Sequence, residues 1–429
     1  MSKTRLSRGR GIIYGNGMTK MDDLQLRRRQ VIVLWCGVVL SFFTSMSKIL
    51  VPGPIVGDLK ALGLDAIELA SLGFGYYCAY AVSQLALGAY SVRWGGVRLM
   101  LFGGSCFVLG SILFPLGSLC PPGYAYWVMF AARMLTGLGA GTMFPGLAKL
   151  LSDLYTGRFA LVFSVVMFIG YLGPICGRTP VLHLVDLVRW RWALEIIAFA
   201  ALTAFAVLVL ASRGAVKPVM SGNSIAALRK VFGSSRNLLL FGASSVVYGA
   251  YYVLPVVMGQ ECLIDSGMSK VNAERLIMFQ VLLIAICNLG TSTILRIFGG
   301  YRKLLLLFVG VCGLAGAVLG AVAFEIYLPL PAVVAAFVLM AIPAGFFSLQ
   351  SLIVKELNPP ELSGISISML NFCAFVLIMS CQPIAGVILD RHRADPCTAY
   401  RDIFIVSIAL EAIGIACALF VPETRPKRS

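Results

Sequence analysis

The stretch GAYSVRWGGVR, residues 88–98, is a short basic and glycine-rich turn between two long apolar segments. Residues 295–303 read LRIFGGYRK, so an aromatic residue, two glycines and an arginine recur in the same order. Arg98 thereby corresponds to Arg302. Two copies of one hydrophilic turn, each between apolar segments, indicate that the chain contains two copies of one structural half.

The composition identifies the class of protein. Of the 429 residues, 59% are hydrophobic and 13% are charged, whereas soluble domains are about 45–50% apolar and about 25% charged. We therefore predict an all-α polytopic membrane protein. A net charge of +16 would favour nucleic acid as the partner of a soluble chain. Here the basic residues lie in the breaks between apolar segments, where they face lipid headgroups, so we expect the lipid bilayer and no nucleic acid as partner.

Several other classes of function find no support in the sequence. The twelve cysteines are scattered singly, without the spacing of metal ligands. No nucleophile is clustered with a base, and no nucleotide-binding loop is present. We therefore expect no enzyme, no metal and no cofactor. The first 30 residues are basic and lack an apolar core, so we expect no removable signal peptide.

Apolar segments long enough to cross a bilayer recur along the chain. A spanning helix needs about 20 apolar residues. The longest polar interruption, residues 213–236, is the expected cytoplasmic linker between an N-terminal six-helix bundle (31–212) and a C-terminal one (237–421). Basic tails are expected at 1–30 and 422–429. The expected spans are 31–51, 66–91, 97–118, 125–150, 158–178, 190–212, 237–258, 274–298, 302–323, 328–354, 362–389 and 399–421.

The orientation follows from the basic residues outside these spans. Lys and Arg are more numerous on the side of the two termini than on the opposite side. Positively charged segments stay in the cytoplasm. We therefore expect a multi-pass protein of the cell (inner) membrane with both termini in the cytoplasm.

Five motifs in a fixed order resemble those of the major facilitator superfamily. This resemblance implies twelve transmembrane helices in two six-helix halves, which are related by pseudo-two-fold symmetry and rock around a central site. Two departures are present, because Val92 stands where the family has an Asp and Arg178 replaces a glycine. The matching stretches are residues 88–98, FAARMLTGLG at 130–139 with Phe144-Pro145, GYLGPICG at 170–177, WRW at 190–192 and VPET at 421–424.

The turns and the fifth span are expected to take part in the conformational change. Glycines let the chain reverse direction within a few residues, and Gly-Pro in a helix favours a kink. In the resembled family the missing Asp helps to latch the outward-facing state, so Val92 predicts a weaker latch. For the glycines, the alternative to a role in the conformational change is that they only allow helices to pack closely. The expected gating residues are Gly88, Arg93, Gly95, Arg98, Arg302, Gly173 and Pro174.

Polar residues recur at spacings of three, four and seven on the spans that line the central cavity in the resembled family. Such spacings place each set on one face of a helix. For each residue, hydrogen bonding between helices is an equal alternative to substrate contact. The predicted substrate-binding residues are Lys48, Arg133, Tyr77, Tyr80, Gln84, Tyr248, Tyr252, Gln280, Asn288, Gln350 and Asn371.

The charges of these spans favour an anionic substrate. Lys48 and Arg133 lie within them, whereas no Asp or Glu lies mid-span in a cavity-lining helix. Lys and Arg bind anions through charge-assisted hydrogen bonds, so we expect a carboxylate, a sugar acid or a phosphorylated small molecule. Residues 54–59 and 80–88 resemble the anion:cation symporter branch, in which an arginine stands where this chain has Ser45. Arg133 has a second interpretation as a structural or coupling arginine.

The sequence thus predicts a monomeric secondary active transporter of a small organic anion, with alternatives. A co-transported proton or sodium ion and anion exchange all stay open. Efflux of drugs or metabolites is favoured by the partial Gly-Pro motif and by the aromatic residues. A transporter-like sensor without transport is the second alternative, because the turn lacks its acid at Val92.

Overall fold

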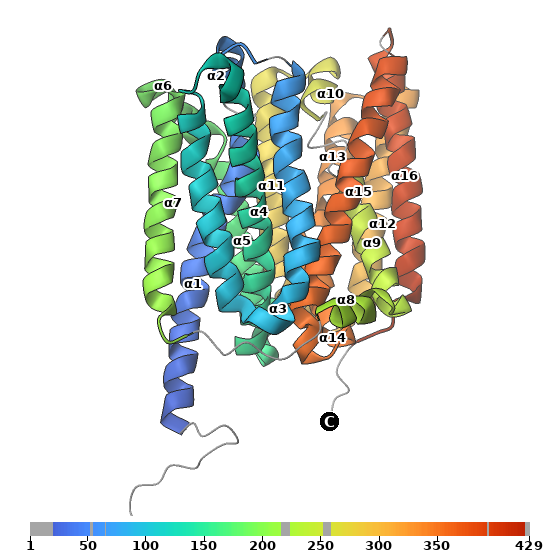
Figure 1. Cartoon of the computed structure of the whole chain (residues 1–429). Helices are drawn as coiled ribbons and strands as arrows, with labels where there is room; N and C mark the ends of the chain where they lie inside the picture. The colour runs from blue at the N-terminus through green and yellow to red at the C-terminus, as the bar shows by residue number, and fades with distance from the viewer. Residues whose placement is uncertain are drawn as a thin grey trace, which may run out of the picture.

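The computed structural model describes residues 20–51, 55–64, 66–215, 224–251, 259–392 and 394–424. Within these ranges the chain forms α-helices and short 3₁₀ turns, and no strand is present. The long helices stand side by side along one direction (Figure 1). A helix bonds its own backbone groups, which is what a chain in lipid requires. The predicted all-α fold is confirmed.

The N-terminal half, residues 20–215, contains one helix that spans two of the expected segments. This helix, α3, is broken by Gly95 at φ 74° and ψ 167°, a conformation that glycine adopts without strain. The turn quoted first above is therefore a kink between two spans. The helices are α1 (Lys20–Leu50), α2 (Val56–Ala61), α3 (Ala66–Gly117), α4 (Pro122–Leu154), α5 (Phe159–Cys176), α6 (Thr179–Val188) and α7 (Trp190–Ser212).

The C-terminal half, residues 224–424, repeats the tight turn between α11 and α12. Gly299 and Gly300 both have positive φ there, at 64° and 79°. Short helix α8 lies in the expected linker. The helices are α8 (Ser224–Phe232), α9 (Ser235–Tyr251), α10 (Gly259–Asp265), α11 (Lys270–Ile297), α12 (Arg302–Glu325), α13 (Leu330–Ala344), α14 (Phe347–Leu357), α15 (Ser363–Arg391) and α16 (Pro396–Phe420).

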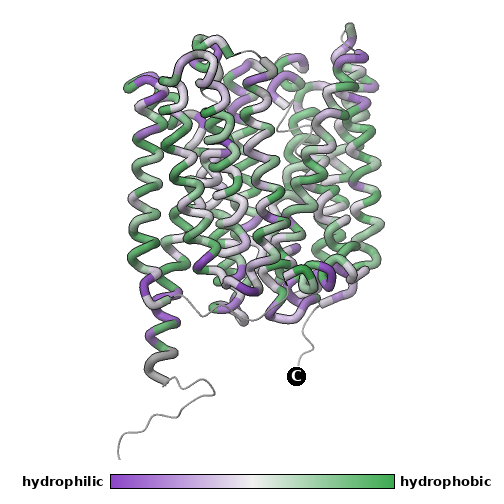
Figure 2. Tube along the Cα trace, in the orientation of Figure 1, coloured by the Kyte–Doolittle hydropathy of each residue, from purple (hydrophilic) through white to green (hydrophobic). Residues whose placement is uncertain are grey.

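In the described part of the chain, nine helical segments are long and apolar enough to cross a membrane. Figure 2 shows apolar residues along the middle of the bundle and hydrophilic residues at its two ends. The chain is thus a multi-pass membrane protein. The remaining expected spans fall on the first part of α3, on α4 and on α9. The nine are Leu24–Leu50, Arg93–Gly117, Thr156–Cys176, Trp190–Ser212, Lys270–Ile297, Arg302–Glu325, Leu330–Leu357, Pro360–Arg391 and Pro396–Phe420.

The helices pack in two groups that follow the two halves of the sequence. Helices α1, α3, α4, α5 and α7 contact one another, and so do α9 and α11 to α16. The groups meet where α15 contacts α3 and α4, and where α5 contacts α11 and α14. Helix α1 begins and α16 ends at the same end of the bundle, which we call the terminal face; the other end is the distal face (Figure 1).

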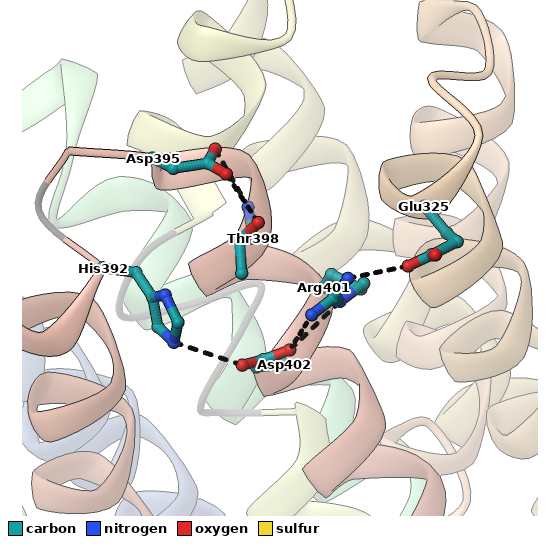
Figure 3. Close-up of polar contacts among 6 residues, drawn as sticks. All are labelled: Glu325, His392, Asp395, Thr398, Arg401 and Asp402. Atoms are coloured by element: carbon teal, nitrogen blue, oxygen red, sulfur yellow. Dashed lines mark hydrogen bonds and ion pairs between the residues drawn. The ribbon is translucent and has the colours of Figure 1, made fainter.

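Charged residues join α12, α15 and α16 at the distal face (Figure 3). Arg401 of α16 donates to Glu325 at the end of α12 at 2.8 Å and to Asp402 at 2.9 Å. The Nε2 atom of His392, which follows α15, lies 3.3 Å from the other oxygen of Asp402. Asp395 begins α16 by accepting from the backbone N–H of Thr398, as an N-cap does. This network therefore holds the distal ends of three helices of the C-terminal half together.

Candidate functional site

A cavity of about 130 Å³ lies between the two halves. Both halves contribute, through α1, α3, α4 and α5 on one side and α9, α14 and α15 on the other. Binding sites of membrane transporters lie at such an interface near the middle of the bundle. We call it the central cavity.

Lys48, in the last turn of α1, carries the one charge among the described residues that line the central cavity. Its Nζ atom lies 4.7 Å from the ring centre of Tyr80 and 5.5 Å from that of Phe375. No carboxylate forms an ion pair with it within the described ranges. A charge at this depth costs several kcal/mol unless it faces a cavity or a partner. Lys48 faces the cavity.

Tyr80 and Asn371 connect the two halves beside this lysine. The Asn371 amide on α15 donates to the Tyr80 hydroxyl on α3 at 3.2 Å. Both side chains also line the central cavity. A hydrogen bond therefore joins the two halves of the protein in the part of the cavity wall next to Lys48.

Three phenylalanines line the part of the cavity towards the terminal face; we call Phe144, Phe163 and Phe347 the aromatic floor. The ring centre of Phe347 lies 6.0 Å from that of Phe144 and 6.2 Å from that of Phe163. Tyr248 approaches Phe347 edge-on at 5.7 Å and donates its hydroxyl to the carbonyl of Ala344 at 2.9 Å. The floor thus joins α4 and α5 to α14 across the interface.

Polar contacts close the interface between this floor and the terminal face. The hydroxyls of Ser152 on α4 and Ser363 on α15 are 2.9 Å apart. Lys355 of α14 donates to the carbonyl of Ser152 at 3.5 Å, and its ammonium lies 4.1 Å from the ring centre of Phe159. We call Ser152, Ser363 and Lys355 the terminal gate, because each contact joins one half to the other.

Arg133, predicted from the sequence as a binding residue, lies outside the central cavity. It is buried and donates to the carbonyl of Ser47 on α1 at 3.2 Å and to that of Val51, the residue after α1, at 3.3 Å. Its guanidinium lies 4.5 Å from the ring centre of Tyr76. The separate cavity beside it measures about 40 Å³ and is lined by the N-terminal half alone. In this structure Arg133 therefore holds α4 against α1.

Three predicted amides are bonded within the C-terminal half. Gln280 donates to the carbonyl of Phe337 at 2.7 Å. Asn288 accepts from the backbone N–H and hydroxyl of Ser348 at 3.2 and 2.9 Å. The remaining amide, Gln350, accepts from the hydroxyl of Ser244 at 2.5 Å. None of the three lines the central cavity, and the bonds described above all lie within one half.

Other predicted residues lie beside the cavity or beyond the described ranges. Tyr77 stacks on Phe375, with ring centres 6.1 Å apart, behind the lining. Gln84 is fully buried one turn below Tyr80 on α3. Tyr252 lies outside the described residues. The structure therefore brings together Lys48, Tyr80, Tyr248 and Asn371 from the predicted set.

Tyr171 and Phe163 were not among the predicted binding residues, although both line the cavity. Tyr171 lies within the Gly-Pro stretch of α5, which was interpreted as a kink and as a feature that favours efflux. Phe163 is one apolar residue in an apolar helix. The only signal for either is its position on the face of α5 that also carries Gly170 and Pro174.

Two of the predicted gating positions are points of close approach. A Cβ atom on Gly88 of α3 would lie 2.8 Å from that of Ser368 on α15, so the two halves touch there. Gly173 packs against the backbone of Phe42 on α1, and Pro174 lines the central cavity. Glycine permits both approaches because it lacks a side chain.

The two turns differ in their partners. Arg302 forms a two-bond ion pair with Glu356 of α14, at 2.9 and 3.2 Å. In the first turn Arg93 is exposed and Arg98 is half-buried, and neither has an ion-pair partner within the described ranges. The side chain of Val92 lies outside the described part of the structure.

Comparison with known proteins identifies the fold. The sequence model of the Major Facilitator Superfamily matches residues 34–379. Among solved structures, the chain is similar to a bacterial homologue of the iron transporter ferroportin in an outward-facing state, with a TM-score of 0.71, 11% identity and coverage of 91% of this chain and 98% of that one. It is also similar to the proton:xylose symporter XylE bound to 6-bromo-6-deoxy-D-glucose, with a TM-score of 0.67, 14% identity and coverage of 93% and 97%. No curated protein matches. At these identities the likeness extends to the fold alone.

Proposed function

This chain belongs to the major facilitator superfamily, a family of membrane transporters, and we propose that it is a secondary active transporter of a small organic anion. In this proposal the bundles 31–212 and 237–421, joined by the linker 213–236, rock as two bodies around the central cavity. In the same proposal the protein lies in the inner membrane of the cell with its terminal face towards the cytoplasm, and it works as a monomer.

The observation that carries the proposal is the position of Lys48. Its ammonium is the one charge of the described lining, and it lies over two aromatic rings instead of beside a carboxylate. A cation–π contact is worth about 0.5–2 kcal/mol, less than the cost of taking an ammonium out of water. An anion would therefore find an unneutralised partner here, while a cation would be repelled.

Polar groups next to Lys48 can complete the binding of an anion. Tyr80 accepts the bond from Asn371, so its own hydroxyl proton can still be donated into the cavity. Ser45 lies on the same face of α1, three residues before Lys48, and also lines the cavity. A carboxylate at this point would combine one charge-assisted bond with one or two neutral ones.

Alternating access then requires the terminal gate to open. Ser152 would separate from Ser363, and Lys355 would leave the carbonyl of Ser152. These are neutral or singly charged hydrogen bonds, each worth about 0.5–3 kcal/mol net. A free-energy difference of this size between the two states can be offset by a difference in their affinity for the substrate.

Efflux of drugs or metabolites is the second candidate, favoured by the aromatic floor of Phe144, Phe163 and Phe347. An aromatic floor can contact the apolar part of lipophilic cargo. The lone ammonium of Lys48 distinguishes the two candidates, because it disfavours lipophilic cations.

Counterflow into proteoliposomes tests the proposal. Proteoliposomes that contain the purified protein are preloaded with an unlabelled carboxylate, sugar acid or phosphorylated solute, or with tetraphenylphosphonium, and uptake of the same labelled solute is measured. We expect saturable counterflow of at least one anion and none of the cation. Saturable cation movement without anion movement would support efflux, and no saturable movement at all would support a sensor. Imposed pH and sodium gradients then identify a co-transported proton or sodium ion.

A further inference from the structure

We propose that the transported anion is a monoanion with a single aromatic ring, whose carboxylate lies at Lys48 and whose ring lies towards the aromatic floor. The inference rests on the proposed function and narrows its substrate class. Three properties of the cavity lead to it: its single charge, the distribution of polar groups along it, and its size.

A single cation favours a single negative charge. Lys48 is the one charged residue of the described lining, and its ammonium lies over two aromatic rings. The face of an aromatic ring is electron-rich and repels an anion. A second carboxylate would therefore be buried without a partner, which costs several kcal/mol. Dicarboxylates and sugar phosphates are disfavoured for this reason.

The polar groups of the lining gather at one end. Thr44, Ser45 and Lys48 come from the last two turns of α1 that line the cavity, and the Tyr80 ring lies beside the Lys48 ammonium. Because α1 begins at the terminal face and Lys48 is in its last turn, this polar end lies towards the distal face (Figure 1). The bound carboxylate is thus placed in the distal part of the cavity.

The opposite end has almost no hydrogen-bonding side chains. Beside the aromatic floor it is lined by Met143, Leu147, Leu151 and Met167. Burying a hydroxyl without a partner costs about 1–3 kcal/mol in proteins, so a polyhydroxylated sugar acid would lose several such bonds here. An aromatic ring instead gains edge-to-face or offset contacts with phenylalanine and with methionine sulfur.

The size of the cavity limits the substrate to one ring. Its volume is about 130 Å³, and an apolar cavity of about 150 Å³ is known to hold benzene. Tyr80 and Phe375, whose ring centres are 4.7 Å apart, form the wall of the cavity over which the ammonium of Lys48 lies. A flat ring can therefore lie between this wall and the floor while its carboxylate reaches Lys48.

Ligand-induced thermal stabilisation of the purified full-length protein tests this inference, because a ligand that binds the folded state raises its stability. The probes are benzoate, phthalate, gluconate and acetate. Phthalate keeps the ring and adds a charge, gluconate keeps the single charge and replaces the ring with hydroxyls, and acetate keeps only the charge. Apparent affinities come from the dependence of the shift on probe concentration.

We expect benzoate to bind at least about tenfold more tightly than each of the other three. Lys48→Gln should abolish this preference, Lys48→Arg should retain it, and Lys60→Gln, which removes an exposed lysine from α2, should leave it unchanged. Should Lys48→Gln fail to fold, the ranking of the four probes on the native protein and on Lys48→Arg decides the matter.

The possible failures are distinguishable. Lys48-dependent binding of gluconate or phthalate that equals or exceeds that of benzoate would overturn this inference and leave the proposed function standing. Benzoate binding that is unchanged in Lys48→Gln would also overturn it. If no anion binds in a Lys48-dependent way, the proposed function fails together with the inference.

Discussion

The ammonium of Lys48 on α1 lies 4.7 Å from the ring centre of Tyr80 on α3. The hydroxyl of the same tyrosine accepts the amide of Asn371 from the other half. One aromatic side chain thus contacts the proposed binding charge and the interface that must open during transport. Binding and conformational change are therefore expected to influence each other through it.

Removal of the Tyr80–Asn371 bond should favour opening towards the terminal face. A neutral hydrogen bond contributes about 0.5–1.5 kcal/mol, so Asn371→Ala should raise the open population about two- to twelvefold. The reporter is Ser91→Cys in a cysteine-free background, because Ser91 is buried against Gly364 of the other half. Its rate of thiol labelling should rise by the same factor.

Tyr126→Phe is the matched control, since it removes a bond to Ser71 that lies within the N-terminal half. Equal labelling rates in Asn371→Ala and Tyr126→Phe would mean that the Tyr80–Asn371 bond does not hold the interface.

Lys355 should contribute more to closure than Asn371. It donates a charge-assisted bond to the carbonyl of Ser152 and lies over the ring of Phe159. Bonds to charged groups are worth about 1.5–3 kcal/mol, so Lys355→Met should raise labelling at Ser91→Cys about 10- to 150-fold. Lys303→Met removes a lysine bonded within its own half, to Leu419, and should change the rate little. Similar labelling rates in Lys355→Met and Lys303→Met would indicate that other residues hold the gate closed.

Arg133 should affect stability and not anion affinity. Arg133→Gln loses the bonds to Ser47 and Val51 that hold α4 to α1, and leaves buried carbonyls without their donor. The expected loss is about 1–3 kcal/mol of unfolding free energy, measured by thermal denaturation in detergent. Anion affinity per folded molecule should stay unchanged. A drop in affinity of tenfold or more, with stability intact, would instead place Arg133 in the binding site.

The cap at Asp395 predicts a dependence of stability on pH. Hydrogen bonds from Thr398 lower the pKa of this carboxylate below its ordinary value. A group whose pKa is lowered by folding stabilises the folded state above its unfolded pKa, near 3.9, and loses that contribution as the pH falls through its folded pKa. The difference in midpoint temperature between the native protein and Asp395→Ala should therefore be present at pH 7 and shrink below about pH 4. A difference that is constant down to pH 3 would contradict the assignment.

Much of the fold could be predicted from the sequence, because apolar length and turn glycines act locally. The turn at 88–98 correctly indicated a break between two spans, and Gly95 provides it with a positive φ. The short helices α6, α8 and α10 were not predicted. They are too short for the span criterion, and their hydrophobic faces have meaning only against neighbours that the sequence does not place.

The site was less predictable, because a polar stripe on a helix does not reveal what it faces. Gln280, Asn288 and Gln350 have the same spacing as cavity residues, yet their partners are Phe337, Ser348 and Ser244 on neighbouring helices. The aromatic floor carries no polar signal at all. Lys48 stood out because a lysine within a span requires either a partner or a cavity.

Uptake at substrate concentrations well below KM, compared between the native protein and Lys48→Gln in proteoliposomes, tests the central claim most directly. The substrate is the anion identified by counterflow, and Lys48→Arg and Lys60→Gln serve as controls that keep the cavity charge. Loss of one charge-assisted bond of about 1.5–3 kcal/mol predicts a decrease of about 10- to 150-fold in Lys48→Gln, with a much smaller change in either control. Uptake by Lys48→Gln equal to that of the native protein would contradict the account.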